Sequence, residues 1–118
     1  MKTLKRSECS ILPLVLKRRW FEMIERGEKT EEYRDDTDYW WTRTSNWCER
    51  GGSLVVEFRL GYQRNAPRMA FEVGPILTPF DTSEEAKKLF VKIRHPEWGE
   101  PDAPHFVISL DERVELED

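Results

Sequence analysis

Four polar side chains that can act on a phosphate or carbonyl group lie within the segment GEKTEEYR, residues 27–34. The ammonium group of Lys29 can hold an anionic oxygen, and a pKa lowered by desolvation would let it act as a base. Thr30 adds a hydroxyl group, and Glu32 adds a carboxylate that can accept a proton from water. The guanidinium of Arg34 can bind a phosphate through two hydrogen bonds or stack on a base. The segment therefore indicates a site for an anionic ligand.

The same charges also have a simpler interpretation. Glu28, Glu31 and Glu32 would favour the charged form of Lys29, so an anion-binding or electrophilic role is favoured over a neutral amine. If the segment is an exposed strand, these residues form only surface ion pairs, which contribute little to stability. An ion pair between Arg34 and Glu32 would then only shape the end of the sheet. The sequence leaves both interpretations open.

Aromatic residues provide a second means of binding nucleic acid. Tyr62 and Gln63 lie in the predicted turn GYQRNAP, and loop residues often contact ligands. Aromatic rings can stack on unpaired bases. Further candidates for stacking are Tyr39, Trp40, Trp41 and Trp47. Most tryptophans in a small domain belong to the core, so we expect about three of the five to be buried.

Other kinds of active site are not indicated. Cys9 and Cys48 are the only cysteines, and His95 and His105 have no partner at a recognisable catalytic spacing. The sequence has no phosphate-binding glycine loop and no HExxH motif. We therefore expect no metal and no cofactor. We also expect reduced thiols and a cytoplasmic location.

The hydrophobic spacing predicts the elements that position these residues. Residues 11–16 form a short apolar strand in which Pro13 favours an edge position. An amphipathic helix over 18–26 follows, and Gly27 ends it. Residues 29–34 then form a strand. One face of this strand would present Lys29, Glu31 and Tyr33, and the other Thr30, Glu32 and Arg34.

The second half of the chain predicts further strands. Residues 54–60 alternate as in a half-buried strand, and residues 69–80 repeat the pattern with a break at Gly74 and Pro75 that indicates a bulge. The strand-like FVISL, residues 106–110, closes the sheet. The remaining segments are interpreted as a short helix or turn (38–47), a short helix (81–90) and a loop (94–105).

Length and composition limit the fold and the partners. A chain of 118 residues is expected to form one domain, with residues 1–10 as a candidate flexible segment. Five or six strands with two or three short helices predict a small mixed β-barrel of the α+β class. The net charge of -4 argues against non-specific coating of duplex nucleic acid. The apolar run over 11–16 is too short to span a membrane.

The segment LPLVLKRRWFEMIERGEKTEEYR, residues 12–34, resembles the opening of ASCH domains, a family with a PUA-like β-barrel. The family pattern is a strand, a helix and then G-x-K-T-x-x-x-R, which stands here as Gly27, Lys29, Thr30 and Arg34. The resemblance continues in YWWTR, VVEFRLGY and HFVISLDERVEL, and it covers nearly the whole chain. It is especially similar to the small ASCH proteins of bacteria and their phages.

The resemblance implies a cleft on the barrel and a task that concerns RNA. One ASCH subgroup removes the acetyl group from N4-acetylcytidine with a Lys, a Thr and a Glu. Its Lys corresponds to Lys29, whereas its Thr falls on Glu32 and its Glu has no clear counterpart here.

We therefore expect binding of RNA or a modified nucleoside in a cleft at the barrel mouth. The expected contacts are Lys29, Thr30, Glu32, Arg34, Tyr62 and Gln63. One alternative is a small hydrolase, either an N4-acetylcytidine amidohydrolase or a ribonuclease, with Lys29 and Glu32 as catalytic residues. A second alternative is a protein-interaction module with a protein partner. The sequence does not indicate the oligomeric state.

Overall fold

The computed structural model describes residues 1–80 and 105–118. The predicted helix over 81–90 and nearly all of the predicted loop over 94–105, including His95, lie outside these residues. The described elements, in chain order, are β1 (Lys2–Lys5), the 3-10 helix η1 (Arg6–Glu8), β2 (Cys9–Val15), α1 (Arg18–Glu25), β3 (Glu31–Asp35), α2 (Asp38–Glu49), β4 (Ser53–Arg59), β5 (Arg68–Leu77) and β6 (His105–Glu117).

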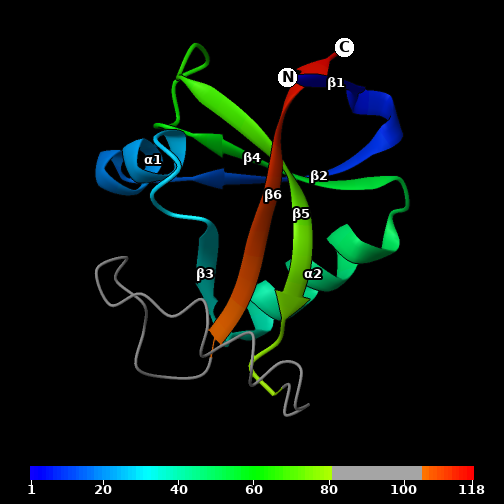
Figure 1. The fold of residues 1–118 in the computed structure, drawn as a ribbon. Coiled ribbons are helices and arrows are strands. Elements are labelled where there is room, and N and C mark those ends of the chain that lie inside the picture. The colour runs from blue at the N-terminus through cyan, green and yellow to red at the C-terminus, as the bar shows by residue number, and fades with distance from the viewer. Residues whose placement is uncertain (81–104) are drawn as a thin grey trace.

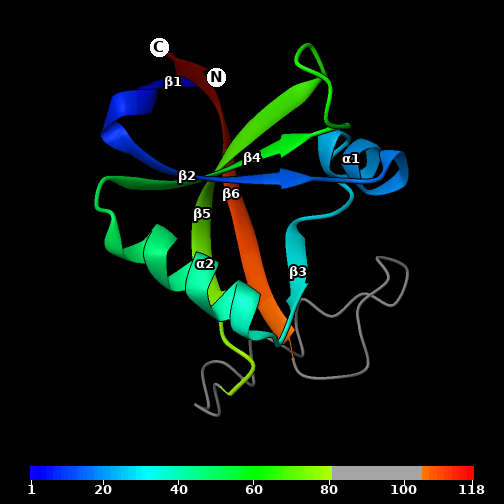
Figure 2. The ribbon, with the colours of Figure 1, turned by 180° about the vertical axis from the view of Figure 1, so that it is seen from behind.

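The six strands form one mixed sheet in the order β1-β6-β5-β4-β2, and β3 also pairs with β6. The long strand β6 is antiparallel to β5 and β3 and parallel to β1, and β2 is parallel to β4. Figures 1 and 2 show β2 and β4 crossing β5 and β6 steeply, so that the sheet curls like part of a barrel. The predicted α+β class is confirmed. The predicted closing strand is β6.

The chain start belongs to this sheet. Residues Lys2–Lys5 pair with Val114–Glu117, so the candidate flexible segment contains a strand. Arg6 forms an ion pair with Glu57 at 2.5 Å and a second one with the C-terminal residue Asp118 at 3.2 Å. Both chain ends therefore lie side by side at the same end of the molecule (Figure 1).

A large core lies between the sheet and the two helices. Phe21 and Ile24 of α1 and Trp47 of α2 pack with the apolar residues of β2 and β4. A second cluster lies on the other face of β4. In it, Val55 packs with residues of β1, β2, β5 and β6. The prediction of a half-buried strand is therefore wrong for β4, because Glu57 and Val55 are buried as well.

Strand β2 lies at the edge of the sheet, as Pro13 predicted, and α2 packs against it (Figure 2). Ser10 Oγ donates a hydrogen bond to the carbonyl of Trp47 at 2.6 Å, and Trp47 Nε1 donates one to the carbonyl of Ser10 at 2.9 Å. Thr37 begins α2 by accepting a hydrogen bond from the backbone N–H of Trp40. These contacts fix the C-terminal part of α2 at the start of β2, and Thr37 begins the helix just after β3 ends.

The predicted bulge and helix end are both present. Register shifts interrupt the pairing of β5 with β6 on either side of Val73, which confirms a bulged strand. After α1, Gly27 has a φ of 80°, which is the left-handed conformation expected just after a helix end. None of the helices in the described part of the chain is long and apolar enough to cross a membrane.

Candidate functional site

Lys29 is a buried residue enclosed by aromatic rings. Its side chain is only 3% exposed, and Nζ lies 4.6 Å from the ring centroid of Trp20 and 5.3 Å from that of Tyr33. Nζ also lies 3.6 Å from Glu32 Oε1. The interpretation of this segment as an exposed strand with surface ion pairs is therefore wrong.

The backbone explains why Lys29 does not follow the predicted strand alternation. The N–H groups of Glu28 and Lys29 both donate to the carbonyl of Met23, so the turn after α1 extends through Lys29. Strand β3 starts only at Glu31. Lys29 consequently reaches Glu32, which the alternation had placed on the opposite face.

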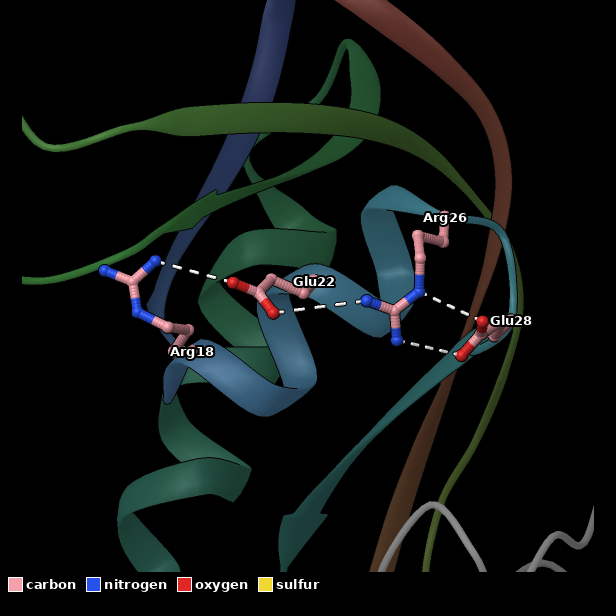
Figure 3. A network of polar contacts seen from close by, with 4 residues as sticks. All are labelled: Arg18, Glu22, Arg26 and Glu28. Atoms are coloured by element: carbon pink, nitrogen blue, oxygen red, sulfur yellow. Dashed lines mark hydrogen bonds and ion pairs between the residues drawn. The ribbon is translucent and has the colours of Figure 1, made fainter.

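Burial lowers the pKa of Lys29, because loss of water disfavours the charged amine. The carboxylate of Glu32 opposes this effect through its charge and a hydrogen bond, and the positive charge of Arg34 lowers the pKa further. Of the three acids predicted to favour the charged form, Glu31 and Glu32 do so, but burial outweighs them and the pKa falls. Glu28, one of those acids, pairs with Arg26 on the surface instead (Figure 3).

Glu32 and Arg34 lie two residues apart in β3, on the same face of the strand. Glu32 Oε1 accepts a hydrogen bond from the backbone N–H of Tyr33 at 2.9 Å. Glu32 Oε2 and Arg34 Nε are both buried and have no hydrogen-bond partner in the described part of the protein. An unsatisfied buried polar atom costs about 1–3 kcal/mol. A ligand that offers a donor to Oε2 and an acceptor to Nε would remove this cost.

The opposite side of β3 has its own polar contacts. Tyr33 Oη donates to Glu31 Oε1 at 3.2 Å, and Thr30 Oγ1 donates to Glu31 Oε2 at 3.1 Å. The Tyr33 ring meets His105 edge-on, with 5.2 Å between the ring centroids. Thr30 therefore contacts Glu31, and the structure does not bring it together with Glu32 and Arg34.

Arg34 extends into a groove of about 300 Å³. Of the six expected contacts, only Arg34 and Tyr62 line it; Lys29, Thr30, Glu32 and Gln63 do not. The guanidinium carbons of Arg34 and Arg43 each lie 5.1 Å from the ring centroid of Trp40. Arg43 also donates a hydrogen bond to Tyr39 Oη at 3.0 Å. Tyr62 completes the wall. The residues that line this groove, called the arginine groove below, are Pro13, Leu14, Val15, Arg34, Tyr39, Trp40, Arg43 and Tyr62.

The aromatic residues of the groove differ in what they can contact. Two guanidinium groups lie over Trp40, so its ring positions arginines and is covered by them. Tyr39 is 60% exposed and Tyr62 is 84% exposed, and both rings can stack on a ligand. Trp47 belongs to the core, and Trp41 packs against Phe106. The fifth tryptophan lies outside the described residues, so the expected number of buried tryptophans stays a prediction.

Gln63 and Arg43 lie elsewhere than the sequence predicted. Gln63 is exposed beside the groove but does not line it, and its backbone carbonyl accepts a hydrogen bond from Arg59. Arg43 was not among the candidates. Once residues 38–49 are known to be a helix, the spacing of Arg43 from Tyr39 and Trp40 by four and three residues places all three side chains together.

No group of three or more His, Cys, Asp or Glu side chains in residues 1–80 and 105–118 is arranged to hold a metal ion. No family model matches the chain, and no curated protein and no solved structure matches it either. The resemblance to ASCH domains therefore stays a prediction.

Proposed function

We propose that this protein is an ASCH domain of the PUA-like kind that binds RNA or a modified nucleoside in the arginine groove. The observation that supports this most strongly is the position of Arg34 and Arg43 over one tryptophan ring, beside two exposed tyrosines. Positive charge together with aromatic rings is the combination by which proteins bind unpaired nucleotides. Both cysteines in the described residues are free, which supports the proposed cytoplasmic location.

The two arginines suit the phosphate group of such a ligand. Stacking on Trp40 fixes both side chains in advance, which reduces the conformational entropy lost when a phosphate binds. Because the whole protein has a net charge of -4, affinity must come from a local concentration of arginines. This charge distribution favours a short unpaired ligand over a long duplex.

The buried pair of Lys29 and Glu32 supports recognition of the base. Glu32 Oε2 is an acceptor that has no partner in the described residues, and it shares a strand face with Arg34. A carboxylate can accept a hydrogen bond from an exocyclic amino group, as it does from cytosine. Glu32 is buried and does not line the arginine groove, so the base reaches it only when neighbouring side chains move aside. Lys29 keeps this carboxylate in place by contacting its other oxygen.

A titration followed by NMR tests the proposal. Cytidine 5′-monophosphate and short single-stranded RNA should shift the signals of Arg34, Arg43 and Tyr62. We expect Arg34→Gln to weaken binding about tenfold or more, because a hydrogen bond to a charged group contributes about 1.5–3 kcal/mol. Arg18→Gln is the matched control, because Arg18 is an exposed arginine on α1 outside the groove. Binding that is unchanged in both Arg34→Gln and Arg43→Gln would exclude the arginine groove, and a protein partner would then become the leading alternative.

One observation also favours a second function, hydrolysis of N4-acetylcytidine. Glu32 has an oxygen without a protein partner in the described residues, and it can take a proton from water as the water oxygen bonds to the acetyl carbon. Lys29 would stabilise the oxyanion, and the proton would pass to the leaving amine as the C–N bond breaks. Acetate release that disappears in Glu32→Gln while nucleoside binding persists would support this function. Binding without any turnover would contradict hydrolysis and leave binding as the only function.

A further inference from the structure

A second groove continues from the arginine groove along α2. Its volume is about 650 Å³, and it shares Pro13 and Arg43 with the arginine groove. The two hollows adjoin at Pro13 and Arg43, where the Arg43 guanidinium bonds to the Pro13 carbonyl. The pair of hollows between β2 and α2 is called the path below. The residues that line the second groove are Leu12, Pro13, Arg43, Asn46, Glu49 and Arg50.

We infer that this path holds a single strand of at least three consecutive nucleotides, with Arg43 and Arg50 on its phosphates. The inference rests on the proposed function and specifies its ligand as an oligonucleotide instead of a lone nucleoside. In this arrangement, one nucleotide lies at Tyr62 and Arg34. The strand then follows α2 toward its C-terminal end.

The spacing of the two arginines matches such a strand. Arg43 and Arg50 are seven residues apart, which is two helical turns, so their side chains lie on the same side of α2. Seven residues correspond to about 10 Å along a helix axis, and about three nucleotides of a stacked strand span the same length at 3.4 Å each. Two phosphates about three nucleotides apart along a bound strand can therefore reach both side chains.

Contacts to the edge strand hold both guanidinium groups over this path. Arg43 Nη2 donates to the carbonyl of Pro13 at 3.2 Å, and Arg50 Nη2 donates to the carbonyl of Ile11 at 3.4 Å. Each guanidinium has five N–H donors, so these bonds leave donors for phosphate oxygens. Asn46, between the two arginines, adds an amide that can bond to a base edge.

Glu49 provides an opposite charge that makes the inference testable in both directions. It lines the second groove beside Arg50 and does not line the arginine groove. Its carboxylate repels a phosphate placed at Arg50. Substitutions of Arg50 and Glu49 should therefore change the affinity for an oligonucleotide in opposite directions, and both should leave a mononucleotide unaffected.

The experiment compares cytidine 5′-monophosphate with oligocytidylates of two, three and five nucleotides at several salt concentrations. For wild-type protein we expect affinity to rise up to three nucleotides. Arg50→Gln should weaken the trinucleotide about tenfold, because one charged hydrogen bond is lost. It should also reduce the slope of log affinity against log salt by about 0.7, the value for one phosphate of a single strand. Glu49→Gln should strengthen trinucleotide binding, and Arg18→Gln should change nothing.

The outcomes separate this inference from the proposed function. A trinucleotide that binds no tighter than the mononucleotide overturns the inference while the arginine groove stands. Equal weakening of both ligands by Arg50→Gln overturns it as well, because the effect then comes from a general change in the protein. If neither the mononucleotide nor any oligocytidylate binds, the proposed function fails too.

Discussion

Residues 18–34 hold two sets of charged side chains that differ in their surroundings. The first, the surface row, consists of Arg18, Glu22, Arg26 and Glu28 on α1 and the turn after it (Figure 3). The second, the buried pair, is Lys29 and Glu32, at 3% and 4% exposure. The two sets are neighbours in sequence, and each pairs a basic side chain with a glutamate.

The two sets differ in the desolvation free energy that their ion pairs cost. Side chains of the surface row remain in water. Their ion pairs therefore gain little attraction energy and lose little hydration energy. The buried pair loses its water, and this cost often exceeds the gain from mutual attraction. Glu32 also keeps a buried oxygen that has no hydrogen-bond partner among the described residues. A buried pair is therefore weak evidence for stability, and we infer that this one has a role in ligand binding.

The largest expected effect is that of Lys29→Met. This substitution leaves the Glu32 carboxylate buried without its cation, and breaking a buried ion pair costs about 3–5 kcal/mol. We expect the free energy of unfolding to fall by this amount in chemical denaturation. A decrease below about 1 kcal/mol, as for a surface pair, would mean that the buried pair is solvated in solution.

The double substitution Lys29→Met with Glu32→Leu is the matched control. Apolar residues that replace both partners of a buried pair often leave stability unchanged or raise it by about 1–4 kcal/mol. We expect the double variant to regain wild-type stability and still lose nucleotide binding. Retained binding would mean that the buried pair has no part in recognition.

The second expected effect is a dependence of stability on pH. Burial lowers the pKa of Lys29 in the folded protein below its ordinary value of 10.5. Between the pKa of the folded state and that of the unfolded state, the unfolded chain binds more protons than the folded protein. The contribution of Lys29 to stability therefore becomes more favourable as pH rises toward 10.5. The slope can reach at most about 1.4 kcal/mol per pH unit, because one proton is involved.

This pH effect is measured against the double variant. Burial raises the pKa of Cys9 and Cys48, so both thiols lower stability as pH rises through the alkaline range. Both proteins contain these thiols, and the difference between their unfolding free energies isolates Lys29. A difference that stays constant or falls from pH 8 to 10.5 would contradict a lowered pKa.

The sequence predicted the elements around the site well, because local rules determine them. Pro13 placed β2 at an edge, and Gly27 ended α1, since each restricts the backbone at its own position. Arg34 and Tyr62 do line one groove, although 28 residues separate them in the chain. Arg34 was predicted because a guanidinium can bind a phosphate, and Tyr62 because it lies in a turn.

The environment of Lys29 was not predictable from its own segment. Its burial depends on Trp20, nine residues earlier, and on the extra turn that bonds to the carbonyl of Met23. Arg43 was missed because charged residues on an aromatic helix look like ordinary surface residues until the helix is placed against β2. These are tertiary contacts, and hydrophobic spacing contains no signal for them.

The smallest expected effect belongs to the surface row. Arg18→Gln removes an i,i+4 pair with Glu22, which contributes about 0.2–0.5 kcal/mol. It also removes a positive charge from the first turn of α1, where the helix dipole disfavours cations. Because the two contributions oppose each other, we expect the free energy of unfolding to change by less than about 0.5 kcal/mol.

The response to salt sharpens this last comparison. Salt screens charges in water far more than buried ones, so the small effect of Arg18→Gln should disappear at high salt, whereas the effect of Lys29→Met should persist. Denaturation curves of both variants at low and high salt measure this directly. If Arg18→Gln destabilised the protein by more than about 1 kcal/mol at either salt concentration, the two sets of charges would not differ in the way that their burial predicts.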